Sequence, residues 1–320
     1  MRKLIAICAA AVLLGANYAM ADWVTLSKPG AQDTYPQGIC NGSIVGYYAD
    51  TSTTANGFLY NGGDPLNGDN WTTLSYPVEN VRNTHPDDID GNTIVGNYTD
   101  ISGNYHGFVY DRTGSIPWIT LDKPEVSYVV PTGISGSNII GTYEGDSPVL
   151  NHGFLYNGTT WKTIDALGWI DTHPQGIDGN NVVGYYNKAP NQETHYNGEA
   201  RGFLYDIIGE SWIPLDMPGA IETCPMSICG NNIIGSYRIA GDASDILHGF
   251  LYDGITWTNI DIAGACKTSP TDIDGNNIVG YYGDPQGFLY TVPEPGTVAM
   301  LASAGAFLFF GAFRRYRLKN

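Results

Sequence analysis

Ile273-Asp274-Gly275-Asn276-Asn277-Ile278-Val279-Gly280-Tyr281-Tyr282, followed by Gly287-Phe288-Leu289-Tyr290, is the stretch that decides the fold. Two short apolar segments flank an Asp-Gly turn, a strong hairpin signal because the tight turn needs a positive φ. Gly-Phe-Leu-Tyr is a further segment of strand length, rich in aromatic residues. Helical periodicity is absent between residues 22 and 290. The stretch therefore predicts a β-hairpin followed by a third strand.

The same pattern occurs six times, with four anchor residues in constant order. The anchors are a tryptophan (Trp23, Trp71, Trp118, Trp161, Trp212, Trp257), a proline (Pro36, Pro86, Pro131, Pro174, Pro225, Pro270), a glycine after Ile or Val (Gly46, Gly96, Gly141, Gly184, Gly235, Gly280) and a phenylalanine (Phe58, Phe108, Phe154, Phe203, Phe250, Phe288). The proline-to-glycine gap is 10 in every copy, and the glycines place the repeat length between 43 and 51. Four short strands in such a repeat are typical of a propeller blade.

The sequence thus predicts an all-β fold, a six-bladed β-propeller of four-stranded blades. The alternative is a β-solenoid, although solenoids usually have shorter coils and no tight hairpins. The repeats begin on Trp23–Leu26, the fourth-strand motif, and end on Gly287–Tyr290, the third-strand motif. Pairing these two segments would close the ring and remove two exposed edges.

The N-terminal segment, residues 1–21, has the features of a secretory signal peptide. A short basic start precedes the apolar run Leu4–Leu14, and the small residues Ala19 and Ala21 predict cleavage by signal peptidase before Asp22. Residues 22–291 would then form the propeller.

Residues 292–320 have the features of a second processing signal. Gly296–Phe313 is long and apolar enough for a transmembrane helix, and Arg314 and Arg315 begin a basic cluster that should stay cytoplasmic. The chain would therefore be held transiently at the inner membrane, with the repeats outside.

Charge excludes some partners. Of the 15 basic residues six lie in the two end segments, with one of the 32 acids, so residues 22–292 carry 9 basic and 31 acidic residues and a net charge of −22. Such a surface repels nucleic acid and anionic lipid. We interpret the excess of acids as a solubility device.

No nucleophile elbow, phosphate loop or metal-binding Cys/His spacing is found. The interval between the anchor glycine and phenylalanine is longest in the fourth copy, at 19 residues. The long loop carries Lys188, Glu193, His195 and Glu199, which makes it a candidate binding loop, since variable loops on a rigid scaffold often carry function. Drift in a solvated loop is the alternative.

Repeated polar positions favour packing over chemistry. His106, His152 and His248 share one position before Gly-Phe. Asp88 and Asp90, like Asp272 and Asp274, resemble oxygen-rich calcium loops. Turn chemistry explains the acids better, so we predict no metal and no cofactor, with calcium as the alternative.

Four cysteines remain after the signal peptide, and export permits disulfides. Cys40 and Cys229 share a repeat position in copies one and five, which are not neighbours. Cys224 and Cys266 lie in neighbouring copies near the proline, so they are the predicted disulfide.

Two resemblances follow from these residues. Val292-Pro293-Glu294-Pro295, the apolar span and Arg314-Arg315 resemble the PEP-CTERM sorting signal. That resemblance implies an exosortase partner, removal of the tail near Pro-Glu-Pro, and a Gram-negative, exopolysaccharide-making bacterium. The protein would then reach the cell surface or extracellular matrix.

The repeats resemble extracellular HAF repeats over nearly all of residues 22–290. The shared parts are the Gly-Ile…Ile-Val-Gly strand pair and a following His-Ala-Phe-Leu-type strand. Here glycine replaces the alanine in every copy, and Asn56, Arg201 or Gln286 replaces the histidine in three. The resemblance implies no chemistry.

Together these features predict an exported, non-enzymatic surface or matrix protein that binds exopolysaccharide or a protein partner. A polysaccharide-active lyase or hydrolase is the first alternative, by analogy of fold alone. A calcium-dependent adhesion module is the second.

Overall fold

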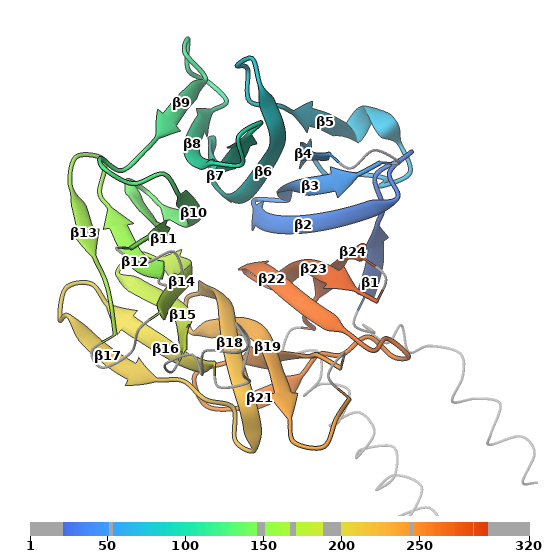
Figure 1. Cartoon of the computed structure of the whole chain (residues 1–320). Helices are drawn as coiled ribbons and strands as arrows, with labels where there is room; N and C mark the ends of the chain where they lie inside the picture. The colour runs from blue at the N-terminus through green and yellow to red at the C-terminus, as the bar shows by residue number, and fades with distance from the viewer. Residues whose placement is uncertain are drawn as a thin grey trace, which may run out of the picture. The chain divides into compact units, whose positions relative to one another are not determined.

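The computed structural model describes residues 22–50, 54–145, 151–166, 171–187, 200–243, 246–283 and 285–293. These residues form β-strands, and the one helix among them is the short 3-10 turn η1 (Gly68–Asn70). None of them belongs to a helix long and apolar enough to cross a bilayer. Val24–Leu289 forms one compact unit in which six four-stranded antiparallel sheets surround a common centre (Figure 1).

The blades follow one another along the chain, each with its first strand at the centre. Blade one consists of β2 (Asp33–Cys40), β3 (Ser43–Ala49), β4 (Ala55–Tyr60) and β5 (Trp71–Leu74). Blade two has β6 (Val81–Asp90), β7 (Thr93–Asp100), β8 (Tyr105–Asp111) and β9 (Trp118–Leu121), and blade three β10 (Val129–Ser135), β11 (Asn138–Glu144), β12 (Asn151–Tyr156) and β13 (Trp161–Thr163). Blade four has β14 (Asp171–Asp178), β15 (Asn181–Asn187), β16 (Arg201–Asp206) and β17 (Ser211–Pro214), and blade five β18 (Ala220–Cys229), β19 (Asn232–Ile239), β20 (His248–Tyr252) and β21 (Trp257–Asn259).

The sixth blade joins the two ends of the chain. Its order is β22 (Thr268–Asp274), β23 (Asn277–Tyr282), β24 (Gln286–Thr291) and then β1 (Asp22–Leu26). Thr25 Oγ1 lies 3.4 Å from the Tyr282 hydroxyl, and Leu26 is buried. The predicted six-bladed propeller, closed by the N-terminal strand, is confirmed, and the solenoid alternative is wrong.

The four anchors have distinct packing roles. Pro36 on β2 pairs with Gly46 on β3, and the other five blades repeat this register across a two-residue turn. A Cβ atom on Gly46 would lie 2.1 Å from the Tyr35 carbonyl oxygen, so only glycine allows the two strands to approach this closely. This geometry explains the constant gap of ten.

The core lies between neighbouring blades. The six anchor phenylalanines are 0–1% exposed, and in blades one to five the anchor tryptophan packs against the phenylalanine at centroid distances of 4.8–5.1 Å. One cluster joins Val45 and Leu59 of blade one to Ile94 and Phe108 of blade two. Each blade therefore buries its faces only when both neighbours are present.

Candidate functional site

A cavity of about 140 Å³ lies where the inner strands meet. Each inner strand has a β-bulge just after its anchor proline, which changes the direction of the next side chains. The bulged residues all line the cavity: Gln37, Asp87, Thr132, Gln175, Met226 and Thr271. The bulges were not predicted, because this position has no common residue type.

A closed ring of hydrogen bonds lies at the turn end of the cavity. The six side chains of this turn ring are Cys40, Asp90, Ser135, Asp178, Cys229 and Asp274. Each accepts a hydrogen bond from a backbone N–H in the turn of the following blade, at 2.6–3.4 Å. Asp274 of blade six accepts from Asn41 of blade one and so completes the ring. The turn ring thus links every blade to the next one by a hydrogen bond.

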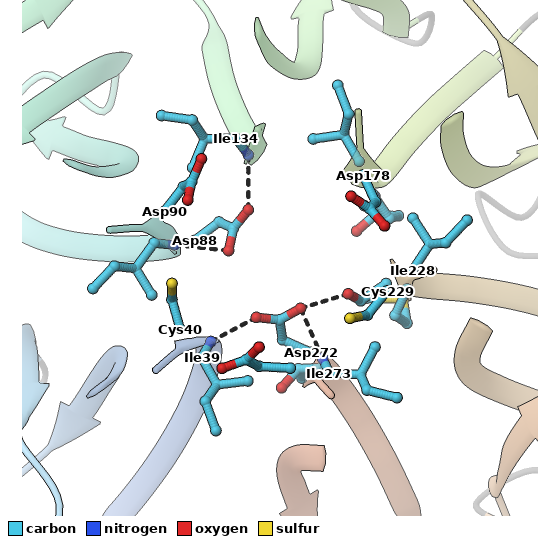
Figure 2. A pocket seen from close by; sticks show the side chains of 18 of the residues that line it. Ile39, Cys40, Asp88, Asp90, Ile134, Asp178, Ile228, Cys229, Asp272 and Ile273 are labelled. Carbon is cyan, nitrogen blue, oxygen red and sulfur yellow. Dashed lines mark hydrogen bonds between the residues drawn. The ribbon is translucent and has the colours of Figure 1, made fainter. Parts of the chain in front are cut away.

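Two carboxylates lie deeper in the cavity and also bridge blades (Figure 2). Asp88 accepts from the N–H of Ile89 in its own strand and of Ile134 in blade three, both at 2.7 Å. Asp272 accepts from Ile39 of blade one at 2.5 Å and from Ser227 Oγ of blade five at 2.5 Å, besides Ile273 of its own strand at 2.8 Å. Both oxygens of each carboxylate therefore accept hydrogen bonds from the protein.

Burial raises the pKa values of three cavity carboxyls. It raises the pKa of Asp87 to about 8 and that of Asp272 to about 6. The pKa of Asp88 is raised by burial first and by the charge of Asp272 second. Desolvation disfavours the charged form of each group. The cavity is consequently less negative near neutral pH than its sequence suggests.

The acids of the two Asp-Gly motifs therefore stabilise the ring. Asp88, Asp90, Asp272 and Asp274 accept backbone N–H groups, and no group of three His, Cys, Asp or Glu side chains in the described part of the chain is placed to hold a metal ion. The calcium alternative remains a prediction that only a binding experiment tests.

A cluster of aromatic and polar side chains lies on the side of the bulges away from the turns. Two of its members are on inner strands, two residues before a bulge, and three are on the second strands β3, β7 and β23. We call Tyr35, Tyr47, His85, Asn97 and Tyr281 the channel belt. The Tyr47 ring stacks on Tyr35 at 4.7 Å and on His85 of blade two at 4.2 Å, and Tyr281 of blade six meets Tyr35 edge-on at 5.3 Å. The belt thus crosses three blades, which is why no single repeat reveals it.

The repeated histidines make repeated side-chain contacts, in line with the packing role that their shared position predicted. His106, His152 and His248 face Asp122, Asp165 and Asp261 at 3.3, 2.5 and 2.6 Å, and Arg201 faces Asp216 at 3.7 Å in blade four. Each histidine also stacks on a tyrosine of the neighbouring strand, at 4.9–5.3 Å. Where the copy has Asn56 or Gln286 instead, serine (Ser75 or Ser27) occupies the position of the aspartate in the repeat. These contacts stabilise the pairing of the third strand with the outer strand in each of these blades.

Several predicted residues lie outside the described part of the chain. They are the candidate loop Lys188, Glu193, His195 and Glu199, the cleavage residues Ala19 and Ala21, and Glu294, Pro295, Arg314 and Arg315 of the sorting signal. Pro293 is described and follows β24 after one intervening residue. The strands that flank the long loop end at Asn187 and begin at Arg201.

The predicted disulfide is not formed in the structure. Cys224 on β18 and Cys266, just before β22, both carry free thiols, as do Cys40 and Cys229. Burial raises the pKa of Cys224 to about 12, which makes it a poor nucleophile near neutral pH. Cys40 and Cys229 instead accept weak hydrogen bonds in the turn ring.

The six sheets, with β1 in the sixth, define a six-bladed β-propeller closed by its N-terminal strand. The sequence matches no protein-family model and no curated protein. Among solved structures, the chain is similar to an acylaminoacyl peptidase of Pyrococcus horikoshii, with a TM-score of 0.52 and 10% identity over 82% of this chain and 52% of the peptidase. The chain thus spans about half the length of that peptidase.

Two further structures are similar. A putative TolB of Agrobacterium tumefaciens has a TM-score of 0.51 and 16% identity, over 82% of this chain and 91% of its own. A Hadza microbial sialidase has a TM-score of 0.50 and 10% identity, over 85% of this chain and 68% of its own. At such identities these similarities concern the fold alone.

Proposed function

We propose that this chain is an exported, non-enzymatic repeat protein of the cell surface or extracellular matrix, which binds exopolysaccharide or a protein partner after exosortase processing. Its cavity carboxylates Asp88 and Asp272 use both oxygens to hold backbone and hydroxyl donors. These inter-blade hydrogen bonds are the observation that supports a binding scaffold over a catalyst, since proton transfer by either carboxyl would compete with the contacts that hold neighbouring blades together.

The export route is tested by localisation. Replacing Pro293, Glu294 and Pro295 by alanine in the native host should leave the protein in the inner-membrane fraction, whereas the unchanged protein should appear at the surface or in the matrix. Equal distribution of the two proteins would count against exosortase processing.

Binding is tested with exopolysaccharide from the same host. The full chain should be retained by the immobilised polymer, and a heat-unfolded sample should not. Retention of neither sample by any polymer or surface protein would contradict the proposed function.

One observation favours a polysaccharide-active enzyme. Asp88 and Asp272 share a cavity, and burial raises both of their pKa values, as in general acids. If this alternative is right, the polymer is depolymerised on incubation, and Asp88→Asn abolishes turnover while the protein still folds. An unchanged size distribution of the polymer supports the binding protein.

A further inference from the structure

Two buried polar atoms in the described part of the chain have no hydrogen-bond partner in the protein, and both belong to the channel belt. They are His85 Nε2 and Asn97 Oδ1, in side chains directly opposite each other on β6 and β7. Buried polar atoms in native proteins nearly always have a partner. Asn97 is only 4% exposed, and its Nδ2 already donates to Asp87 Oδ2 at 2.8 Å. Its oxygen therefore requires a donor that the protein does not supply.

More hydrogen-bonding groups nearby are uncommitted. The hydroxyls of Tyr35, Tyr47 and Tyr281 make no hydrogen bond to any residue that the structure describes, nor does the side-chain amide of Gln37. Gln37 lines the cavity and lies two residues after Tyr35 on the same strand. The belt and the adjoining cavity wall thus present several donors and acceptors at one place, on blades six, one and two.

These groups carry little charge near neutral pH. Burial lowers the pKa of His85 to about 4, so its imidazole is neutral, and the raised pKa of Asp87 keeps that carboxyl protonated below about pH 8. Lys267 lies against the Tyr281 ring, with its Nζ 5.1 Å from the ring centroid. The neutral belt groups would repay little of an ion's lost hydration, whereas a neutral polyol loses less. Lys267 would favour an anionic sugar instead, so the test compares neutral with uronic-acid oligomers.

We propose that the channel belt binds an uncharged sugar unit of an extracellular polysaccharide, with the tyrosine hydroxyls, Gln37 and Asn97 as hydrogen-bond partners. The inference rests on the proposed function and assigns it a site and a class of ligand. Sugar hydroxyls both donate and accept, which suits an unpaired amide oxygen beside unpaired hydroxyls. The cavity of about 140 Å³ is below the size of a typical small-molecule pocket of roughly 300 Å³ or more. The cavity, which Gln37 and Asp87 line and the belt rings do not, therefore has room for no more than about one sugar unit beside the belt.

The test removes hydroxyls and keeps the rings. The full chain and the triple variant Tyr35→Phe/Tyr47→Phe/Tyr281→Phe are titrated by calorimetry with neutral gluco-, galacto- and manno-oligosaccharides and with uronic-acid oligomers of equal length. Each lost hydrogen bond is worth about two- to tenfold in affinity, so the triple variant should bind the neutral oligomer at least about tenfold more weakly. Tyr156→Phe is the matched control, because the Tyr156 hydroxyl bonds to the Gly158 carbonyl in an outer hairpin and its loss should leave affinity unchanged.

Each outcome of the titration supports or overturns the channel belt as the sugar-binding site. Preference for neutral oligomers, weakened by the triple variant alone, supports the belt as the site. Equal affinity of the triple variant, or preference for the uronic acids, overturns it. If the triple variant is still retained by the immobilised host exopolysaccharide, the proposed function stands and the polymer binds elsewhere on the protein. Absence of binding to every polymer defeats both proposals.

Discussion

The glycine before each anchor phenylalanine decides how closely two blades approach. A Cβ atom on Gly153 would lie 2.5 Å from the Ile164 carbonyl oxygen and 2.9 Å from Pro174 of the next blade. The same contact recurs around the ring, up to Gly287 against Pro36 of blade one at 2.8 Å. A methyl group here would push two blades apart, which gives a physical reason for glycine at this position in all six copies.

Gly153→Ala should therefore destabilise the ring. Overpacking of this kind costs roughly 1–3 kcal/mol in the free energy of unfolding, which urea denaturation followed by tryptophan fluorescence would measure. Gly68→Ala is the control, because nothing lies within 4 Å of its added Cβ. Equal midpoints for the two variants would show that the blades can separate at no cost.

The Asp87 carboxyl should make stability fall as pH rises. Its pKa is raised by burial to about 8 in the folded protein, so the folded state holds its proton more tightly than the unfolded chain does. That contribution is complete below about pH 4 and is lost as pH rises towards 8, at up to roughly 1.4 kcal/mol per pH unit. Asp87→Asn should flatten the decline in melting temperature between pH 6 and 8.5.

His85 acts in the opposite direction. Burial lowers its pKa to about 4, so its contribution is complete above about pH 6.5 and is lost as pH falls towards 4. Measurements above pH 6.5 therefore exclude His85. Burial raises the pKa values of Asp88 and Asp272 as well, so the contribution of Asp87 is the difference between the wild-type and Asp87→Asn curves. Asp69→Asn, at an exposed position in η1, should follow the wild-type curve, and a similar curve for Asp87→Asn would refute the assignment.

At the scale of elements, the turn ring stabilises contacts that no single blade contains. Its members differ in sequence, but aspartate, serine and cysteine can all accept a hydrogen bond. Asp178 accepts from the N–H of Gly230 at 2.7 Å, and Ser135 does the same for Gly179 at 3.1 Å. The repeat position therefore requires a short acceptor rather than a charge.

Asp178→Ala should lower the free energy of unfolding by about 1 kcal/mol, the usual net value of one hydrogen bond. Asp178→Ser should restore most of the loss, as serine does naturally in blade three. Chemical denaturation of the three proteins distinguishes these cases. If serine is no better than alanine, the charge of Asp178 matters rather than its hydrogen bond.

The strands and the number of blades could be predicted from the sequence, because each anchor residue makes its contacts within one blade or at a contact that every blade repeats. Pro36 and Gly46 mark a cross-strand pair, and Phe58 marks the core of a blade. The channel belt was not predictable, since Tyr47 meets His85 only after two blades pack side by side. The bulges could not be predicted from the sequence either, because Gln37 and its counterparts share a backbone geometry rather than a type of side chain.

For the molecule as a whole, closure depends on the five residues of β1, Asp22–Leu26. β1 supplies the outer strand of blade six, as the offset of the first and last motifs predicted. Removing residues 22–26 should leave β24 with an unpaired edge, lower the melting temperature and favour self-association. Size-exclusion chromatography and thermal unfolding would detect both effects. A synthetic peptide of residues 22–30 added in trans should reverse them, and a monomer of unchanged stability would show that closure contributes nothing.

The closing strand also sets an order of events in time. Thr25 and its partner Tyr282 lie 257 positions apart, and synthesis proceeds at about 5–20 residues per second, so β1 waits roughly 13–50 s for β24. During that interval β1 can pair with the sixth blade of another chain. Ring closure within one chain therefore competes with exchange of β1 between chains, and the proportion of exchanged dimers should rise with the local concentration of newly made protein.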